Sequence, residues 1–450
     1  MSAEAPGARA LGLDGGGGGG APGGPGDGAD SGLGDSMKRS TWALFAGVFA
    51  ACVALTLVTG YELHDPDSRL YAGLSADLAA RPVADWVAPE WGGRWSRDGL
   101  FREHPPGMLW LGAALARLGL GGFGAVYTVN FICLFLELLL LFRLGRRLGG
   151  PLVGAAAIFA WAANPTFIQY LVRGNHEHPL ALAVVLTLYA LAGTRTGRAR
   201  LLAWIVALGL AVWVKGVSGL ALLPIAGAYW LVYERRARLF AEVALGALVV
   251  LATLLVFELA YRAHTGESFW QVYLERQVRF SLGAGSGEAA LASGTAGPLV
   301  TLAHKARNVA YYLARPLWFF FPWVFFVAYA LVQRLRHRRV AGETTTLAFG
   351  LGLIPAVVFL FGFSLADRKA DRYVMPCYPG LALAFGWWLV HGDPPRLVRA
   401  LGAWLERRWR ALPYALSLGL LVGVGVKIFV GTYYYWDIRF WSGAFDHLAP

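Results

Sequence analysis

The chain of 450 residues is 57% hydrophobic and only 15% charged, with a mean hydropathy of +0.50. Soluble domains carry about 25% charged residues, so this composition indicates an integral membrane protein and excludes secreted enzymes, cytosolic enzymes and nucleic-acid-binding proteins. The net charge of +12 does not indicate a nucleic-acid partner, because the basic residues form short clusters between apolar runs, as cytoplasmic loops do. Three scattered cysteines offer neither a disulfide framework nor the spacing of a metal site.

The first 36 residues are rich in Gly, Ala, Pro and Asp and lack any apolar period. Such a composition cannot form a packed core, so we expect 1–36 to be a disordered, Gly-rich cytoplasmic tail. We expect 37–450 to form one polytopic transmembrane domain.

Long apolar runs predict the transmembrane helices. The run 107–119 has only about 13 residues, and a crossing needs about 20, so we expect it to be a helix lying on the outer surface. Without it, arginine clusters occupy every second gap between spans, and the N-terminus is cytoplasmic. The fold class predicted is an all-α integral membrane protein with about 11 spans: 41–60, 123–142, 151–171, 179–194, 201–214, 217–233, 240–260, 316–332, 345–363, 375–391 and 412–432. The two short spans around Lys215 could instead form one re-entrant hairpin without changing this orientation.

This topology places the polar residues on two sides of the membrane. The cytoplasmic turns are short and rich in arginine, whereas the outer loops are 61–106, 172–178, 261–315 and 364–374. The long outer loops carry carboxylates, histidines and tryptophans, and loops of such length usually have a function. We therefore expect the chemistry on the outer face.

The first candidate segment directly follows the first predicted span and contains Asp65, Asp67 and Tyr71. A carboxylate at the membrane boundary can act as a general base if its surroundings raise its pKa towards the working pH. Asp67-Ser68 also has the pattern of an N-terminal cap for a helix over 68–80. The two roles are compatible, because a cap would hold the carboxylate at the surface.

The second candidate is Glu103-His104, followed by two prolines. The prolines could simply begin the helix over 107–119. In the functional interpretation, Glu103 and His104 face the same pocket as Asp67, as metal ligands or phosphate contacts.

The third candidate is the short outer loop with Arg173 and the run His176-Glu177-His178. The run has three interpretations: metal ligands, a polar cluster at a helix interface, or a site that binds donor or acceptor.

Cations on the outer side form the fourth candidate. Lys215 stands at a predicted helix end, where it could extend to the headgroups or hold an anionic ligand. The loop 364–374 carries Arg368, Lys369 and Arg372. Outer positive charge opposes the usual bias, and an anionic ligand such as a lipid phosphate would explain it.

The loop 261–315 has two parts. Its first part, with Trp270, Tyr273 and Arg276, could form an amphipathic helix, whereas 281–297 is rich in Gly, Ala and Ser. The loop could be a lid beside the site or only a linker.

Taken in order, these motifs resemble the polyprenyl-phosphate-dependent glycosyltransferases of the membrane-embedded C-type fold. The most similar groups are the lipid A aminoarabinose transferases and the protein O-mannosyltransferases of family 39. The resemblance covers about residues 40–390 and rests on the order of its parts. These are the first predicted helix, Asp67-x-x-x-Tyr71, Glu103-His104-Pro105-Pro106, the non-crossing helix, Lys215-Gly216, and Lys369-x-x-x-Tyr373-x-x-Pro376 followed by Tyr378-Pro379.

The resemblance implies roles for particular residues. Asp67 would be the catalytic base, with Asp65 and Glu103 as further catalytic candidates. The donor phosphate would be bound by His104, Lys215, Lys369, Arg372 and Tyr373, and the rest of the substrates by Tyr71, Arg173, Glu177 and His178. A divalent metal ion at Glu103, His176 and His178 is an option that the sequence does not require.

One replacement within the motifs bears on specificity. His104 stands where the aminoarabinose transferases have lysine, whereas the mannosyltransferases also have histidine before two prolines. This weakens any assignment to aminoarabinose in particular.

The implied reaction transfers a sugar from a polyprenyl-phosphate donor to a hydroxyl of a lipid, glycan or protein acceptor, at the outer face of a bacterial-type inner membrane. One displacement inverts the anomeric centre, and cations stabilise the leaving phosphate. A second carboxylic acid, as in glycosidases, is not required.

Two other functions fit an envelope membrane protein. A lipid-linked sugar transporter or flippase would place ionisable residues at mid-membrane and often show internal repeats. Here Glu137 and Glu258 are the only acids well within the predicted spans, each near an end, and no repeat is evident. An envelope polysaccharide ligase or polymerase would have a large outer loop late in the chain, which 261–315 partly provides.

Overall fold

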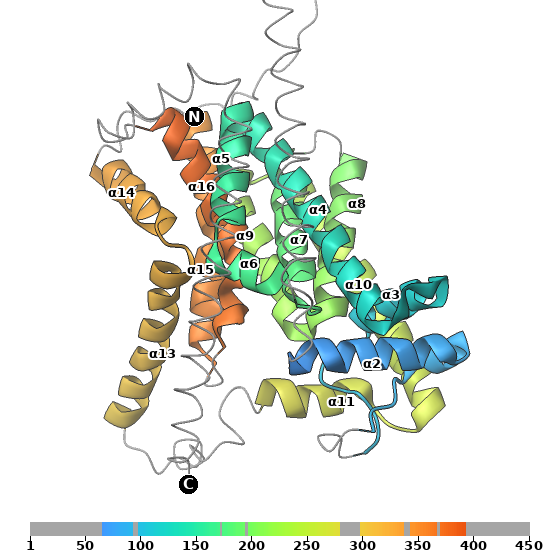
Figure 1. The fold of residues 1–450 in the computed structure, drawn as a ribbon. Coiled ribbons are helices and arrows are strands. Elements are labelled where there is room, and N and C mark those ends of the chain that lie inside the picture. The colour runs from blue at the N-terminus through green and yellow to red at the C-terminus, as the bar shows by residue number, and fades with distance from the viewer. Residues whose placement is uncertain are drawn as a thin grey trace, which may run out of the picture. The chain divides into compact units, whose positions relative to one another are not determined.

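The computed structural model describes residues 65–92, 98–171, 173–193, 197–279, 298–336, 343–366 and 370–392. The predicted tail 1–36 and the predicted spans 41–60 and 412–432 lie outside these residues. Across the described ranges the chain is helical, and the one strand-like pairing there is an isolated bridge between Glu90 and Leu100. The all-α prediction is therefore confirmed for this part of the chain (Figure 1).

The elements follow one another in this order: α2 (Pro66–Ala80), η1 (Val83–Val87), α3 (Gly107–Leu115), η2 (Ala116–Leu120), α4 (Gly121–Gly149), α5 (Pro151–Ala162), α6 (Pro165–Leu171), α7 (Glu177–Leu188), η3 (Tyr189–Gly193), α8 (Gly197–Lys215), η4 (Gly216–Ala221), α9 (Leu222–Val232), α10 (Ala237–Thr265), α11 (Phe269–Tyr273), η5 (Leu274–Arg279), α13 (Pro298–Phe319), α14 (Trp323–Arg336), α15 (Glu343–Ser364), η6 (Asp371–Cys377) and α16 (Tyr378–His391).

Five helical stretches of the described chain are long and apolar enough to cross a membrane, judged by length and composition: 107–149, 197–232, 237–265, 347–364 and 372–391. Two shorter apolar helices, 151–162 and 177–193, accompany them. The membrane character of the fold is thus borne out, whereas the count of about 11 spans stays a prediction.

Two predicted spans are interrupted, and proline stands at each interruption. The predicted span 316–332 is divided, because α13 ends at Phe319 and α14 begins at Trp323, directly after Pro322. In the predicted span 151–171, the Asn164 side chain accepts a hydrogen bond from the backbone of Thr166 (2.8 Å), and Pro165 begins α6. Asn followed by Pro is a helix start, so one span becomes two helices.

The predicted surface helix 107–119 is separate from the long helix that follows. Helix α3 ends at Leu115, and the turn η2 contains Gly119 at φ 94°, a conformation that other residues rarely adopt. Helix α3 packs beside α2, and both contact α4 (Figure 1).

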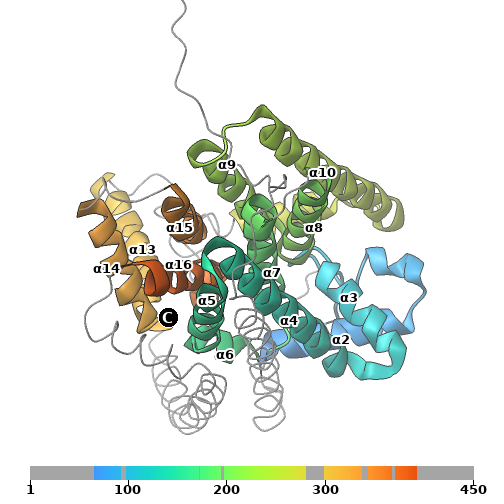
Figure 2. The ribbon, with the colours of Figure 1, turned by 90° about the horizontal axis from the view of Figure 1, so that it is seen from above.

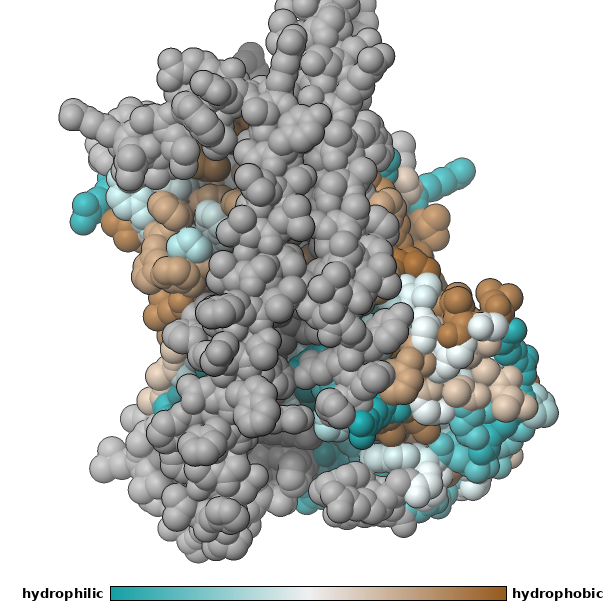
Figure 3. All heavy atoms as spheres, viewed as in Figure 1, coloured by the Kyte–Doolittle hydropathy of each residue, from teal (hydrophilic) through white to brown (hydrophobic). Residues whose placement is uncertain are grey.

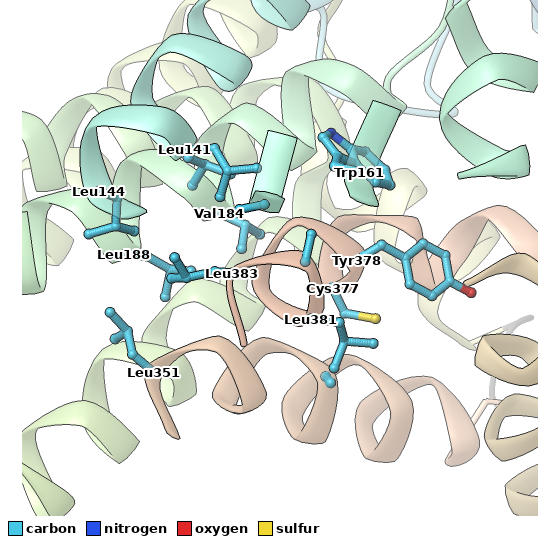
Figure 4. Close-up of a cluster of buried hydrophobic side chains, with 14 of the residues drawn as sticks. Leu141, Leu144, Trp161, Val184, Leu188, Leu351, Cys377, Tyr378, Leu381 and Leu383 are labelled. Atoms are coloured by element: carbon cyan, nitrogen blue, oxygen red, sulfur yellow. The ribbon is translucent and has the colours of Figure 1, made fainter. Parts of the chain in front are cut away.

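The main hydrophobic core lies between α4, α5, α7, α15 and α16. Figure 4 shows side chains from these helices meeting there, among them Leu141, Trp161, Val184, Leu351 and Leu383. Seen from above, α7 lies between α4 and α8 (Figure 2), and it also contacts η6. This packing places the first residue of α7 next to the end of α8 and the start of η6.

Polar and apolar surfaces are separated along the described helices. In Figure 3, hydrophilic side chains gather at the lower right, around α2, whereas hydrophobic ones are visible higher up, on both sides of the grey region. Helix α10 exposes a row of large apolar side chains, including Leu248, Leu255, Val256 and Leu259. An apolar face of this kind is what a helix presents to lipid.

Candidate active site

Four charged side chains from four elements form a continuous set of ion pairs, which we call the charge cluster. Arg372 Nη1 lies 2.7 Å from Asp67 Oδ2, and its Nε lies 3.6 Å from Glu177 Oε1. Lys215 Nζ contacts the same Glu177 oxygen at 2.7 Å. Lys215 and Glu177 are buried, whereas the side chains of Arg372 and Asp67 are 30% and 32% exposed. The cluster is therefore closed at Lys215 and open at Asp67.

Helix ends explain why these residues meet. Glu177 is the first residue of α7, Lys215 is the last of α8, and Asp67 lies in the first turn of α2. Arg372 is the second residue of η6, which packs on α7. Charged side chains are tolerated at the ends of apolar helices because the helix interior can stay apolar.

Asp65 and Asp67 differ sharply in their surroundings. Asp65 is the N-cap of α2: its Oδ2 accepts hydrogen bonds from the backbone (2.9 Å) and hydroxyl (2.6 Å) of Ser68. It is buried, which raises its pKa, and Arg173 Nη1 lies 3.9 Å from its Oδ1. The predicted cap at Asp67-Ser68, beginning a helix at 68, is therefore wrong, because Pro66 already occupies the first helical position and leaves Asp67 free to face Arg372.

Ser68 also connects α2 to the loop before α7. Its hydroxyl accepts a hydrogen bond from the backbone of Gly174 (2.9 Å). The side chain of Asn130 on α4 donates to the carbonyl of Arg173 in the same loop. These bonds fix the segment that carries His176 and Glu177.

Three aromatic side chains pack beside the charge cluster. The His176 ring lies 4.4 Å from the Tyr71 ring and 4.7 Å from the His104 ring, both edge-on. Burial holds the pKa of both imidazoles well below the usual range, and the nearby cations Lys215 and Arg372 act in the same direction. Burial likewise raises the pKa of Tyr71. All three rings are therefore neutral at pH 7.

The three residues considered for a metal ion do not converge. The Glu103 carboxylate accepts a hydrogen bond from the side chain of Gln277 on η5. His178 turns into the helix bundle, where its Nδ1 lies 3.3 Å from Glu137 Oε2. His176 lies beside the charge cluster, against Tyr71 and His104. In the described ranges, no group of three or more His, Cys, Asp or Glu side chains is placed to hold a metal ion.

Lys215 has one further contact of its own, and the backbone that follows it makes another. Its Nζ lies 5.7 Å from the centre of the Tyr373 ring, which stacks on Phe363. The next residue but one, Val217, donates its backbone N–H to the hydroxyl of Tyr273 (3.0 Å). Lys369, also predicted as a phosphate ligand, lies outside the described residues.

The segment 267–279 is attached to the first loop by three polar contacts. Arg102, which is buried, lies 2.5 Å from Glu267, and Arg276 lies 2.9 Å from Asp98. The third contact is that of Gln277 with Glu103. The predicted helix in this region is confirmed as α11 and η5.

The sequence has no local signal for the contacts of Gln277 with Glu103 and of Glu137 with His178, because the partners are far apart in the chain.

Comparison with known proteins identifies the class of this fold. The structure of ArnT from Cupriavidus metallidurans bound to undecaprenyl phosphate aligns with a TM-score of 0.58, at 19% identity over 89% of this chain and 72% of that one. The apo structure of the same protein aligns with a TM-score of 0.51 over 84% and 62%. The two alignments show that this chain has the fold of ArnT.

Sequence comparison leads to the same group. Residues 103–261 match the family model described as dolichyl-phosphate-mannose-protein mannosyltransferase. The undecaprenyl phosphate-α-4-amino-4-deoxy-L-arabinose arabinosyl transferase of Pseudomonas aeruginosa is 29% identical over 78% of this chain. The protein of the same description from Pectobacterium atrosepticum is 27% identical over 86%. The chain spans 60% and 66% of the length of these two relatives. The resemblance to polyprenyl-phosphate-dependent glycosyltransferases is therefore confirmed.

Proposed function

We propose that this chain transfers a sugar from a polyprenyl-phosphate donor to an acceptor hydroxyl at the outer face of the cell membrane. The observation that carries the proposal is the charge cluster, in which two cations converge on one buried carboxylate and the far end opens at a second carboxylate. The relatives, which are described as transferases of a sugar linked to undecaprenyl phosphate, support the same class of donor.

Lys215 and Arg372 are the groups that we assign to the donor phosphate. As the glycosidic bond breaks, negative charge grows on the phosphate oxygen, and fixed cations stabilise that charge. Before the donor binds, Glu177 pairs with both cations and Asp67 pairs with Arg372, which offsets the cost of burying their charges. We propose that the phosphate takes over part of this contact with Glu177. His104 and Tyr373, which lie close to Lys215, border the same position.

Asp67 is the group that we assign as the base. It is partly exposed, so an acceptor can reach it, and Arg372 connects it to the phosphate position. The acceptor hydroxyl gives its proton to Asp67, and its oxygen bonds to the anomeric carbon. The bond from that carbon to the phosphate oxygen breaks, and its electron pair leaves with polyprenyl phosphate. Attack from the face opposite the phosphate inverts the anomeric centre.

The test is release of free polyprenyl phosphate by the full chain in liposomes, given a panel of polyprenyl-phosphate sugars and cell-envelope lipid extract. Asp67→Asn is expected to lower the rate by about 10²- to 10⁴-fold, the usual contribution of a general base. Asp77→Asn is the matched control, because Asp77 is an exposed acid of the same helix whose ion pair is with Arg81 and not with the charge cluster. Equal rates for Asp67→Asn and the native chain would refute Asp67 as the base.

A further inference from the structure

The backbone directly after Lys215 is held by a side chain from a distant segment. Helix α8 ends at Lys215 and η4 begins at Gly216, so the first N–H groups of η4 have no partner within the helix. One of these donors, Val217 N–H, is satisfied by the hydroxyl of Tyr273, which lies 56 residues further along the chain. Tyr273 thus caps η4 at the point where the chain leaves the charge cluster.

Gly216 makes this contact possible in two ways. Its φ of +58° is a left-handed conformation that favours glycine. A Cβ atom at this position would also overlap the hydroxyl of Tyr273. The Lys215-Gly216 pair therefore has a structural partner in Tyr273, which explains why a glycine follows the lysine.

Tyr273 is itself fixed in place. It is buried, and its ring stacks on Phe269 with centroids 5.9 Å apart and packs against Trp270 at 5.7 Å. Burial raises its pKa to about 12, so the hydroxyl is neutral and can accept the hydrogen bond from Val217. The contacts of Glu267 with Arg102 and of Arg276 with Asp98 attach the segment on both sides of Tyr273 to the first loop.

We propose that Tyr273 is a positioning residue for Lys215: by fixing the break between α8 and η4, it sets where the ammonium group stands for the lipid phosphate. The proposal rests on the proposed function, in which Lys215 binds the donor phosphate. It makes phosphate affinity depend on whether the segment 267–279 is docked.

The first measurement is the affinity of the full chain in nanodiscs for undecaprenyl phosphate. Tyr273→Phe removes only the hydroxyl, and loss of one hydrogen bond is expected to weaken binding by about 2- to 10-fold. Tyr329→Phe is the matched control, because its hydroxyl also accepts one hydrogen bond, from Gln333 within its own helix, and it lies on α14. The control is expected to bind as the native chain does.

A double-mutant cycle separates positioning from a general loss of structure. If Tyr273 acts through Lys215, Tyr273→Phe has no further effect on affinity in a Lys215→Met background. An equal loss in both backgrounds would overturn the proposal, and so would native affinity in Tyr273→Phe itself.

Hydrogen exchange at the Val217 amide tests the contact without any ligand. The amide is expected to exchange about 2- to 10-fold faster in Tyr273→Phe than in the native chain. Unchanged exchange would overturn the positioning role. If Lys215→Met alone bound undecaprenyl phosphate as tightly as the native chain, the proposed function would fail at Lys215, and faster exchange at Val217 would still support Tyr273 as the residue that fixes the backbone there.

Discussion

Glu177 is the residue on which both cations of the charge cluster converge, so its loss affects them together. Its side chain is 2% exposed, and the Lys215 ammonium lies against it. Breaking a buried pair by removing one partner costs about 3 to 5 kcal/mol, because the other charge stays buried without compensation.

Glu177→Gln is therefore expected to lower the thermal stability of the chain in nanodiscs, and undecaprenyl phosphate is expected to restore more of it than it adds to the native chain. The reason is that the lipid phosphate would supply the negative charge that the variant lacks. Thermal unfolding with and without the lipid measures this difference. Glu234→Gln is the control, because it removes a carboxylate that pairs with Arg200 instead. The same lipid-induced shift in Glu177→Gln and in the native chain would contradict the prediction.

The two neutral histidines give the stability a defined dependence on pH. His104 and His176 have pKa values well below 6.5 in the folded chain, so below pH 6.5 the unfolded chain binds more protons than the folded one. Stability is then present above pH 6.5 and is lost as the pH falls towards the folded pKa values, by at most about 1.4 kcal/mol per pH unit for each group. Thermal unfolding between pH 7.5 and 5.5 should show this slope. His104→Gln should reduce it, whereas replacing the exposed His264 by Gln should not; an unchanged slope in His104→Gln would count against the buried neutral imidazole.

The sequence predicted Asp67, Glu177, Lys215 and Arg372 as site residues, and the structure brings them together. Their signal was local, since each is a charge at the end of an apolar run. His178 was predicted at the site, whereas its side chain contacts Glu137. An alternating pattern in the sequence cannot reveal such a partner, which lies 41 residues away on another helix.

The start of helix α2 gives different roles to two acids that are two residues apart in the sequence. Asp65 caps the helix and Asp67 faces Arg372. Asparagine is as good an N-cap as aspartate, whereas alanine is not.

Asp65→Asn is therefore expected to keep the release of polyprenyl phosphate within about 10-fold of the native rate and to preserve stability. Asp65→Ala is expected to lose about 1 to 2 kcal/mol of stability, since the Ser68 backbone and hydroxyl lose their acceptor. The release rate and thermal unfolding of both variants check this. A rate in Asp65→Asn as low as that of Asp67→Asn would indicate that Asp65 takes part in the chemistry.

The helices themselves were predicted well where an apolar run is continuous, as in α4 and α10. The divisions at Pro165 and Pro322 were missed, because hydropathy does not change across them. The prolines, and the asparagine before Pro165, are residues that mark helix ends and were visible in the sequence. We predicted unbroken spans because each apolar run has the length expected of a membrane crossing.

The two ends of α10 allow the orientation of the chain in the membrane to be tested. Its 29 residues would extend about 43 Å, which is enough to cross a bilayer. Arg235 lies just before it and Glu267 just after it, on the segment that contacts the first loop.

The proposed orientation predicts that a membrane-impermeant maleimide labels Glu267→Cys on intact spheroplasts, and labels Arg235→Cys only after the membrane is opened. Both changes are made with Cys52 replaced by serine. Cys133 and Cys377 are buried and can remain. The reverse labelling pattern would place the charge cluster on the cytoplasmic side and would contradict the outer-face proposal.

The internal carboxylate of the charge cluster has a consequence for selectivity among anions. Because Glu177 already occupies Lys215 and approaches Arg372, any anion that enters has to compete with a tethered carboxylate at very high local concentration. Chloride or inorganic phosphate competes with Glu177 through its charge alone. A polyprenyl phosphate also brings a long hydrocarbon chain, which stays in the bilayer and keeps the headgroup near the site. The arrangement would thus exclude freely dissolved anions and admit those that arrive through the membrane.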